Sequence, residues 1–189
     1  METIKKRIIV PTDFSKASLS GIRYALSMAG DCGGEVIVLH IITDQVLRQK
    51  LTSPFAYAPE VYYFTDQWRS NLQGLNLEDL VHDKMQRLSD LLDRVLGADL
   101  RERVKVTPLI RLGGVVKEIV ATAKEEGCDL VVMASRERSR LGSLFTRSLT
   151  QQVVRLAPCP VLSIQPSAHV RTQQGKWVPV REMEYGKAA

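Results

Sequence analysis

Residues 35–42 read EVIVLHII, so this segment is apolar at nearly every position. A strand with one face in water alternates apolar and polar residues, whereas an uninterrupted apolar run indicates a strand that is covered on both faces. A parallel sheet flanked by helices on both sides provides that cover. The segment therefore favours an α/β fold built on a parallel sheet.

Four other apolar runs have the length of strands: residues 7–11, 104–110, 129–134 and 160–164. Apolar residues between the runs recur at helical spacing, as Leu19, Ile22 and Leu26 do after the candidate N-cap Ser15. Further helices are expected around residues 81–95, 116–123 and 148–156. The alternation predicts a five-stranded, doubly wound parallel sheet with helices on both faces. Ligands of such sheets bind at the carboxyl ends of the strands, here in the loops 11–15 and 134–147.

Three segments divide the chain. Residues 1–166 are expected to form a single domain. Within it, residues 43–79 form an insert between the second strand and the second helix, with six of the eleven aromatic residues. We interpret the insert as packing on its own domain or on a partner subunit, with stacking on bases as the alternative. Residues 167–189 are a polar tail, for which disorder and docking on a partner both stay open.

The composition argues against several classes of protein. No apolar run reaches the roughly 18–20 residues that cross a bilayer, and the polar residues 1–6 do not resemble a secretion signal. The three cysteines, Cys32, Cys128 and Cys159, have no CxxC or disulfide-framework spacing, which favours a reducing cytoplasm. Because metal-ligand spacings, triad signatures and a GxxxxGK[ST] loop are lacking, we expect no metal site and no catalytic residues.

Basic residues gather in one segment. The chain has a net charge of +5, and residues 134–155 contain five arginines but a single acid, Glu137. Such a cluster is either a solvated basic face or an anion site for phosphate. Contact with nucleic acid or a membrane surface is the weakest interpretation, and we expect no insertion into a membrane.

Three motifs carry a resemblance to a known family: IIVPTDFS at residues 8–15, GCDLVVM at 127–133 and SLTQQVVRLAPCPV at 148–161. Together they resemble the universal stress protein family. The resemblance implies strand order 3-2-1-4-5, an adenine nucleotide alpha hydrolase-like fold. It also implies a homodimer, formed through the last strand at residues 160–164. Some members of the family bind ATP, and others act as stress-response or regulatory modules without it.

ATP-binding members carry the pattern G-x-x-G-x9-G-[ST], whose glycines bring backbone N–H groups close to phosphate oxygens. The matching positions here are Ala134, Glu137, Arg147 and Ser148, so only the serine is kept. Glu137 adds a negative charge where phosphates would lie. Arg147 either prevents the close approach of the loop backbone to the phosphates or binds a phosphate through its own guanidinium. The resemblance thus implies a degenerate ATP-binding loop.

The half of the site that holds the base and ribose is better kept. The resemblance places Pro11, Thr12, Asp13, Ile41 and Met133 there. Asp13 also fits a simple helix cap, and the two interpretations stay open. The candidate nucleotide-binding residues are Pro11, Thr12, Asp13, Ile41, Met133, Ala134, Arg147, Ser148 and Leu149.

Two functions follow from this pattern. The first is a non-enzymatic stress-response or regulatory module, dimeric and with a degenerate nucleotide site. The alternative is a protein that binds ATP or another adenine nucleotide through Asp13 and the 134–148 loop, with slow ATP turnover. An unidentified protein partner is compatible with both.

Overall fold

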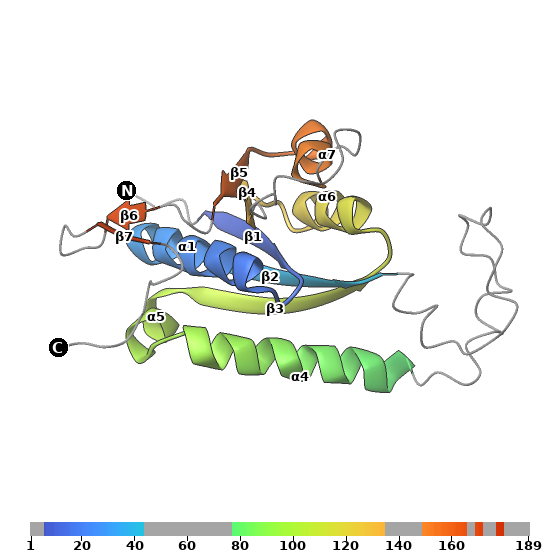
Figure 1. Ribbon diagram of the computed structural model, residues 1–189, viewed down its shortest axis with the longest axis horizontal. Helices are drawn as coiled ribbons and strands as arrows, with labels where there is room; N and C mark the ends of the chain where they lie inside the picture. The colour runs from blue at the N-terminus through green and yellow to red at the C-terminus, as the bar shows by residue number, and fades with distance from the viewer. Residues whose placement is uncertain (1–5, 44–76, 135–148, 166–168, 172–176, 180–189) are drawn as a thin grey trace, which may run out of the picture.

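The computed structural model describes residues 6–43, 77–134, 149–165, 169–171 and 177–179. The elements follow one another as β1 (Arg7–Thr12), α1 (Lys16–Cys32), β2 (Glu35–Ile42), α4 (Leu77–Val95), α5 (Ala98–Arg103), β3 (Lys105–Leu112), α6 (Val115–Glu125), β4 (Leu130–Ala134), α7 (Leu149–Leu156), β5 (Val161–Ile164), β6 (His169–Arg171) and β7 (Trp177–Pro179) (Figure 1). None of the described helices is both long and apolar enough to span a bilayer.

β1 to β5 form one parallel sheet in the order β3-β2-β1-β4-β5. This confirms the predicted fold class and strand order. The order reverses between β1 and β4, because β2 and β3 extend the sheet on one side of β1 and β4 and β5 extend it on the other. The carboxyl ends of β1 and β4 therefore meet at the switch point, where doubly wound sheets bind ligands.

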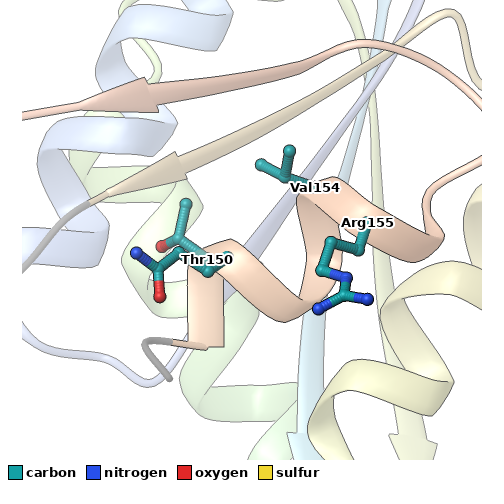
Figure 2. A pocket seen from close by; sticks show the side chains of 4 residues that line it. Thr150, Val154 and Arg155 are labelled. Atoms are coloured by element: carbon teal, nitrogen blue, oxygen red, sulfur yellow. The ribbon is translucent and has the colours of Figure 1, made fainter. Parts of the chain in front are cut away.

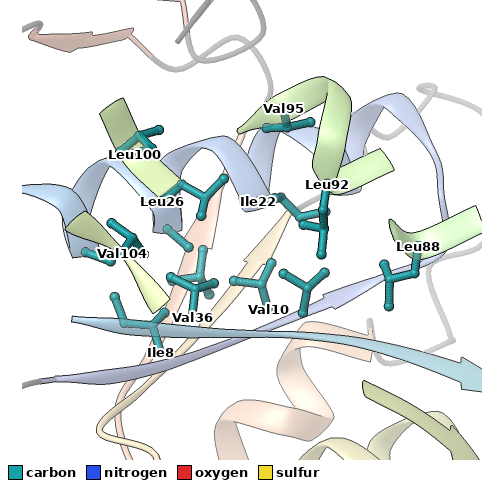
Figure 3. Packing of buried hydrophobic residues seen from close by; sticks show 14 of the residues in the cluster. Ile8, Val10, Ile22, Leu26, Val36, Leu88, Leu92, Val95, Leu100 and Val104 are labelled. Atoms are coloured by element: carbon teal, nitrogen blue, oxygen red, sulfur yellow. The ribbon is translucent and has the colours of Figure 1, made fainter. Parts of the chain in front are cut away.

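Two helical layers cover the sheet, with α4 on one side and α6 and α7 on the other (Figure 1). Because side chains alternate along a strand, Ile8 and Val10 of β1 face α1, α4 and α5, whereas Ile9 faces α6 and α7. Figure 3 shows the first of these two clusters, in which Leu26 and Leu92 close over the strands. Residues 35–42 are thus covered on both faces, as predicted.

Local signals fix the ends of α1. The Ser15 hydroxyl accepts a hydrogen bond from the N–H of Ser18, which makes Ser15 the N-cap as predicted. Gly33 ends the helix with φ of 71°, in the left-handed region that glycine adopts without a steric cost. Ser15 and Gly33 therefore set where α1 begins and ends.

Some elements differ from the prediction. α4 begins at Leu77, so its first turn lies in the stretch assigned to the insert, and residues 44–76 of the insert lie outside the described residues. The short helix α5 was not predicted, because six residues carry too little periodicity. In the tail, β6 and β7 pair in antiparallel fashion, and Val178 packs against the larger core cluster. These two strands were not predicted, because three residues in a polar segment are too few to show an alternation of apolar and polar side chains.

Candidate functional site

The sheet opens at its switch point. The ladder between β1 and β2 has six paired positions and continues to Thr12 and His40. The ladder between β1 and β4 has two, Ile8 with Leu130 and Ile9 with Val131. Within the described residues the pairing of β1 with β4 therefore ends before their carboxyl ends, and this unpaired end of the sheet is where doubly wound folds bind ligands.

Pro11, Ile41 and Met133 lie on the same face of the sheet near this opening. Ile41 and Met133 belong to the cluster beneath α6 and α7, and they are 9% and 4% exposed. Pro11 follows Ile9 by two positions, so strand alternation places it on that face too, and it is half-buried. Three of the predicted site residues thus form an apolar wall at the carboxyl ends of β1, β2 and β4.

Thr12 points the other way, toward α1. Its buried hydroxyl lies 3.0 Å from the hydroxyl of Ser18 and accepts a hydrogen bond from the N–H of Phe14 at 3.1 Å. Its carbonyl accepts a hydrogen bond of 2.9 Å from Nδ1 of His40. The side chain that sequence analysis assigned to a ligand is therefore occupied inside the protein, and it shapes the turn that follows.

Asp13 is exposed at the end of β1. Its Oδ1 accepts a hydrogen bond of 3.0 Å from the N–H of Ser15, which is an Asx turn. The helix cap is Ser15, so Asp13 organises the turn before the helix instead of capping it. The carboxylate therefore lies at the surface beside the switch point, with one oxygen bonded to the Ser15 N–H.

Phe14 has an unusual backbone. Its φ of 61° is left-handed, a conformation that costs a bulky residue on the order of 1–3 kcal/mol. The Phe14 ring lies against the His40 imidazole, with ring centroids 4.3 Å apart, and the guanidinium of Arg87 lies 4.7 Å from the centre of the same ring. Burial lowers the pKa of His40, and the charges of Lys84 and Arg87 lower it further, against the opposing effects of its hydrogen bond to Thr12 and of Asp13. Its surroundings therefore favour the neutral imidazole.

The remaining candidates fall on β4 and the loop after it. Ala134 is half-buried beneath α1, where a Cβ built on Gly21 would lie 3.5 Å from the Ala134 Cβ. Leu149 opens α7 and is 42% exposed. Arg147 and Ser148 lie outside the described residues, as does Glu137. The described residues thus include the positions that the resemblance assigns to the base and ribose, together with Ala134 and Leu149.

A second surface feature lies on α7. Thr150, Gln151, Val154 and Arg155 line an open hollow of about 340 Å³ (Figure 2). Val154 and Leu156 are large apolar side chains on this helix and are 56% and 61% exposed. The hollow follows the outer side of the helix and is not the opening between β1 and β4.

The fold agrees with the comparison with known proteins. The model of the universal stress protein family matches residues 5–165. The chain belongs to the universal stress protein family. The universal stress protein MJ0577 of Methanocaldococcus jannaschii is 25% identical over 166 residues, which cover 87% of this chain and 98% of that protein. Universal stress protein YxiE of Bacillus subtilis is 25% identical over 159 residues, with 84% and 98% covered.

Solved structures of universal stress proteins share the fold. The structure of MJ0577 superposes with a TM-score of 0.58 at 22% identity, covering 86% of this chain and 96% of that one. A universal stress protein solved in complex with cAMP superposes with a TM-score of 0.52 at 16% identity, covering 85% and 97%. The adenine nucleotide alpha hydrolase-like fold implied by the motifs is thereby confirmed.

Within this universal stress protein, the sequence did not single out Phe14 and Arg87, and it gave His40 no role. Phe14 could not be recognised from the sequence, because the type of a residue other than glycine does not indicate that its φ is left-handed. The one available signal was His40 itself, a titratable residue in an otherwise apolar strand. Among the described residues, no group of three or more His, Cys, Asp or Glu side chains is placed to hold a metal ion.

Proposed function

We propose that this chain is a non-enzymatic stress-response module that recognises an adenine nucleotide at the carboxyl ends of β1, β2 and β4. The observation that carries the proposal is the opening of the sheet between β1 and β4, with an apolar wall on one side and an exposed carboxylate at its edge. Pockets for small molecules combine these two features, because apolar walls bind rings and a few polar groups fix orientation.

The ligand chemistry follows from the residue types. Ile41 and Met133 offer apolar contacts to the face of a purine ring. The carboxylate of Asp13 is acceptor-only, so it suits a donor such as a ribose hydroxyl or an exocyclic amine. A related fold solved in complex with cAMP supports an adenine nucleotide as the ligand class. The described residues therefore fit the adenosine part of such a ligand.

The phosphate side is proposed to differ from that of ATP-binding members. Glu137 and Arg147 stand where the family motif has glycine, so the loop offers fewer bare N–H groups and carries a carboxylate. Two like charges about 4 Å apart repel by about 1–4 kcal/mol. We therefore propose a ligand with a single phosphate, such as AMP or cAMP, over ATP, and no ATP turnover.

Calorimetric titration with adenosine, AMP, cAMP and ATP tests this proposal. We expect saturable binding of AMP or cAMP at micromolar concentration and weaker binding of ATP. Asp13→Asn should weaken binding about tenfold, which corresponds to one charge-assisted hydrogen bond. Asp90→Asn, which changes an exposed carboxylate on α4, is the matched control and should leave affinity unchanged. Absence of saturable heat for all four ligands at millimolar concentration would overturn the proposal.

Glu137→Gly tests the phosphate side separately. Removing this carboxylate should increase the affinity for ATP by up to about tenfold while the affinity for adenosine stays the same. An equal change for both ligands, or none for ATP, would show that Glu137 does not face the phosphates. Release of inorganic phosphate from ATP, measured with the same samples and lost in Asp13→Asn, would favour the slow-turnover alternative.

A further inference from the structure

Three side chains from three different elements meet beside Asp13. Phe14 comes from the loop after β1, His40 from β2 and Arg87 from α4. The His40 ring packs against one part of the Phe14 ring at 4.3 Å, and the Arg87 guanidinium lies over the Phe14 ring at 4.7 Å. The Arg87 guanidinium is attracted to the ring electrons and the His40 ring packs on the same side chain, so both neighbours hold Phe14 in place.

This cluster restrains a backbone conformation that a phenylalanine rarely adopts. With φ at 61°, the residue after Asp13 turns the chain sharply from β1 into α1. The Phe14 N–H is bonded to the Thr12 hydroxyl, and the Thr12 carbonyl is bonded to Nδ1 of His40. Strained residues of this kind persist where the surroundings over-determine them, and they gather at ligand sites.

His40 contributes in two ways. Its ring supplies the packing surface for Phe14, and its Nδ1–H supplies the hydrogen bond to the Thr12 carbonyl. The charged groups that act on its ring are Asp13 on the loop and Lys84 and Arg87 on α4. His40 thus links the strand to the strained turn, and Phe14 links that turn to the helix through Arg87.

We propose that His40 and Arg87 are positioning residues, which hold Phe14 and thereby fix the turn that presents the Asp13 carboxylate to the nucleotide. This proposal rests on the proposed function, since it assigns a purpose to the turn beside that site. Neither side chain touches the ligand in this scheme. The same cluster ties α4 to the site, so a displacement of α4 at Arg87 changes the affinity for nucleotide.

Amide hydrogen exchange measured by NMR tests the positioning directly, without nucleotide. The reporters are the N–H groups of Phe14 and Ser15, which are bonded to Thr12 and Asp13 respectively. His40→Ala should speed their exchange tenfold or more while core amides in β2 keep their protection. His82→Ala, which removes an exposed histidine from α4, is the control and should have no effect. Unchanged exchange at Phe14 and Ser15 in His40→Ala would overturn the proposal.

Two partial replacements separate positioning from simple loss of packing. His40→Asn keeps a donor near the place of Nδ1, and His40→Phe keeps a ring against Phe14. Each should restore part of the protection lost in His40→Ala. Arg87→Met lies on an exposed position of α4, so it leaves the core intact and should speed exchange about threefold. Exchange in Arg87→Met equal to that of the wild type would remove Arg87 from the scheme.

Titration with AMP then links the turn to binding. His40→Ala should weaken AMP binding about tenfold, and His40→Asn should recover part of it. If the wild type binds no adenine nucleotide, the proposed function fails, and the exchange data still decide whether the cluster fixes the turn. If His40→Ala speeds exchange while AMP affinity stays at the wild-type value, the positioning role is wrong and the proposed function stands.

Discussion

At the scale of the residue, Thr12 illustrates how the site depends on groups that do not reach the ligand. Its hydroxyl and carbonyl together bind three partners, on the turn, on α1 and on β2. The resemblance to the family identified Thr12 as a site residue but could not assign its side chain to the interior. Side-chain direction at the last position of a strand depends on which helix covers that face, and only the packed fold decides this.

Thr12→Val should lower the free energy of unfolding by about 1–3 kcal/mol, because it leaves the Phe14 N–H without its acceptor in a half-buried place. Thr12→Ser keeps the hydroxyl and should cost clearly less. Urea denaturation followed by circular dichroism measures both. Equal stabilities of the two variants would mean that the hydrogen bonds of the hydroxyl contribute nothing.

His40 predicts a dependence of stability on pH. Because its pKa is lowered from 6.5 in the folded protein, folding favours the neutral imidazole. The stabilisation is complete above pH 6.5 and is lost as the pH falls from 6.5 through the folded-state pKa. Glu35, whose pKa is lowered from 4.5 mainly by its bond to Lys105, loses its contribution only at more acidic pH.

Thermal melting of the wild type and His40→Phe between pH 7.5 and 5.0 checks this prediction. The melting temperature of the wild type should fall over this range, and that of His40→Phe should fall less, because a residue without a titrating group replaces the histidine. Parallel curves for the two proteins would contradict the assignment of a lowered pKa to His40.

At the scale of the element, the strands and longer helices were predictable because each carries a long period of apolar residues. α5, β6 and β7 are too short for any period, and their existence depends on the surfaces they pack against. The close approach of the connection between α1 and β2 to the start of β1 was also not predictable from the sequence. Gly34 makes it possible, since a Cβ there would lie 2.6 Å from the carbonyl oxygen of Lys6.

Gly34→Ala should therefore destabilise the protein by about 1–3 kcal/mol, because backbone must shift to admit the methyl group. Gly21→Ala is the matched control: its Cβ would meet Ala134 at an ordinary contact distance of 3.5 Å, and alanine favours the helix by about 0.5–1 kcal/mol. Denaturant melts of both variants give the comparison. A greater loss in Gly21→Ala would contradict the packing described for α1.

The prediction of a homodimer concerns the surface formed by α7 and β5. β5 is an edge strand of four residues, and no described strand pairs with its outer side. The neighbouring helix exposes Val154 and Leu156. We expect light scattering at tens of micromolar to give the mass of a dimer, and Leu156→Lys to shift it toward the monomer, whereas Lys124→Glu, on an exposed position of α6, should not. A monomer in the wild type would contradict this expectation.

At the scale of the whole molecule, the uniform apolar strand at residues 35–42 was enough to predict a two-faced parallel sheet, and the family motifs supplied its strand order. The same reasoning located the ligand edge of the sheet, and the opening between β1 and β4 lies there. What it could not provide is the strained turn at Phe14 and the contacts that hold it, since these join residues 14, 40 and 87 across three elements.

Methyl NMR of the wild type during titration with AMP tests the central claim most directly. Ile41 and Met133 carry methyl groups in the wall beneath the opening, and Met28 lies on the opposite face of the sheet as an internal reference. We expect saturable shifts for Ile41 and Met133, lost in Asp13→Asn, with Met28 unmoved. Shifts confined to Val154 on α7, or no shifts at millimolar AMP, would contradict it.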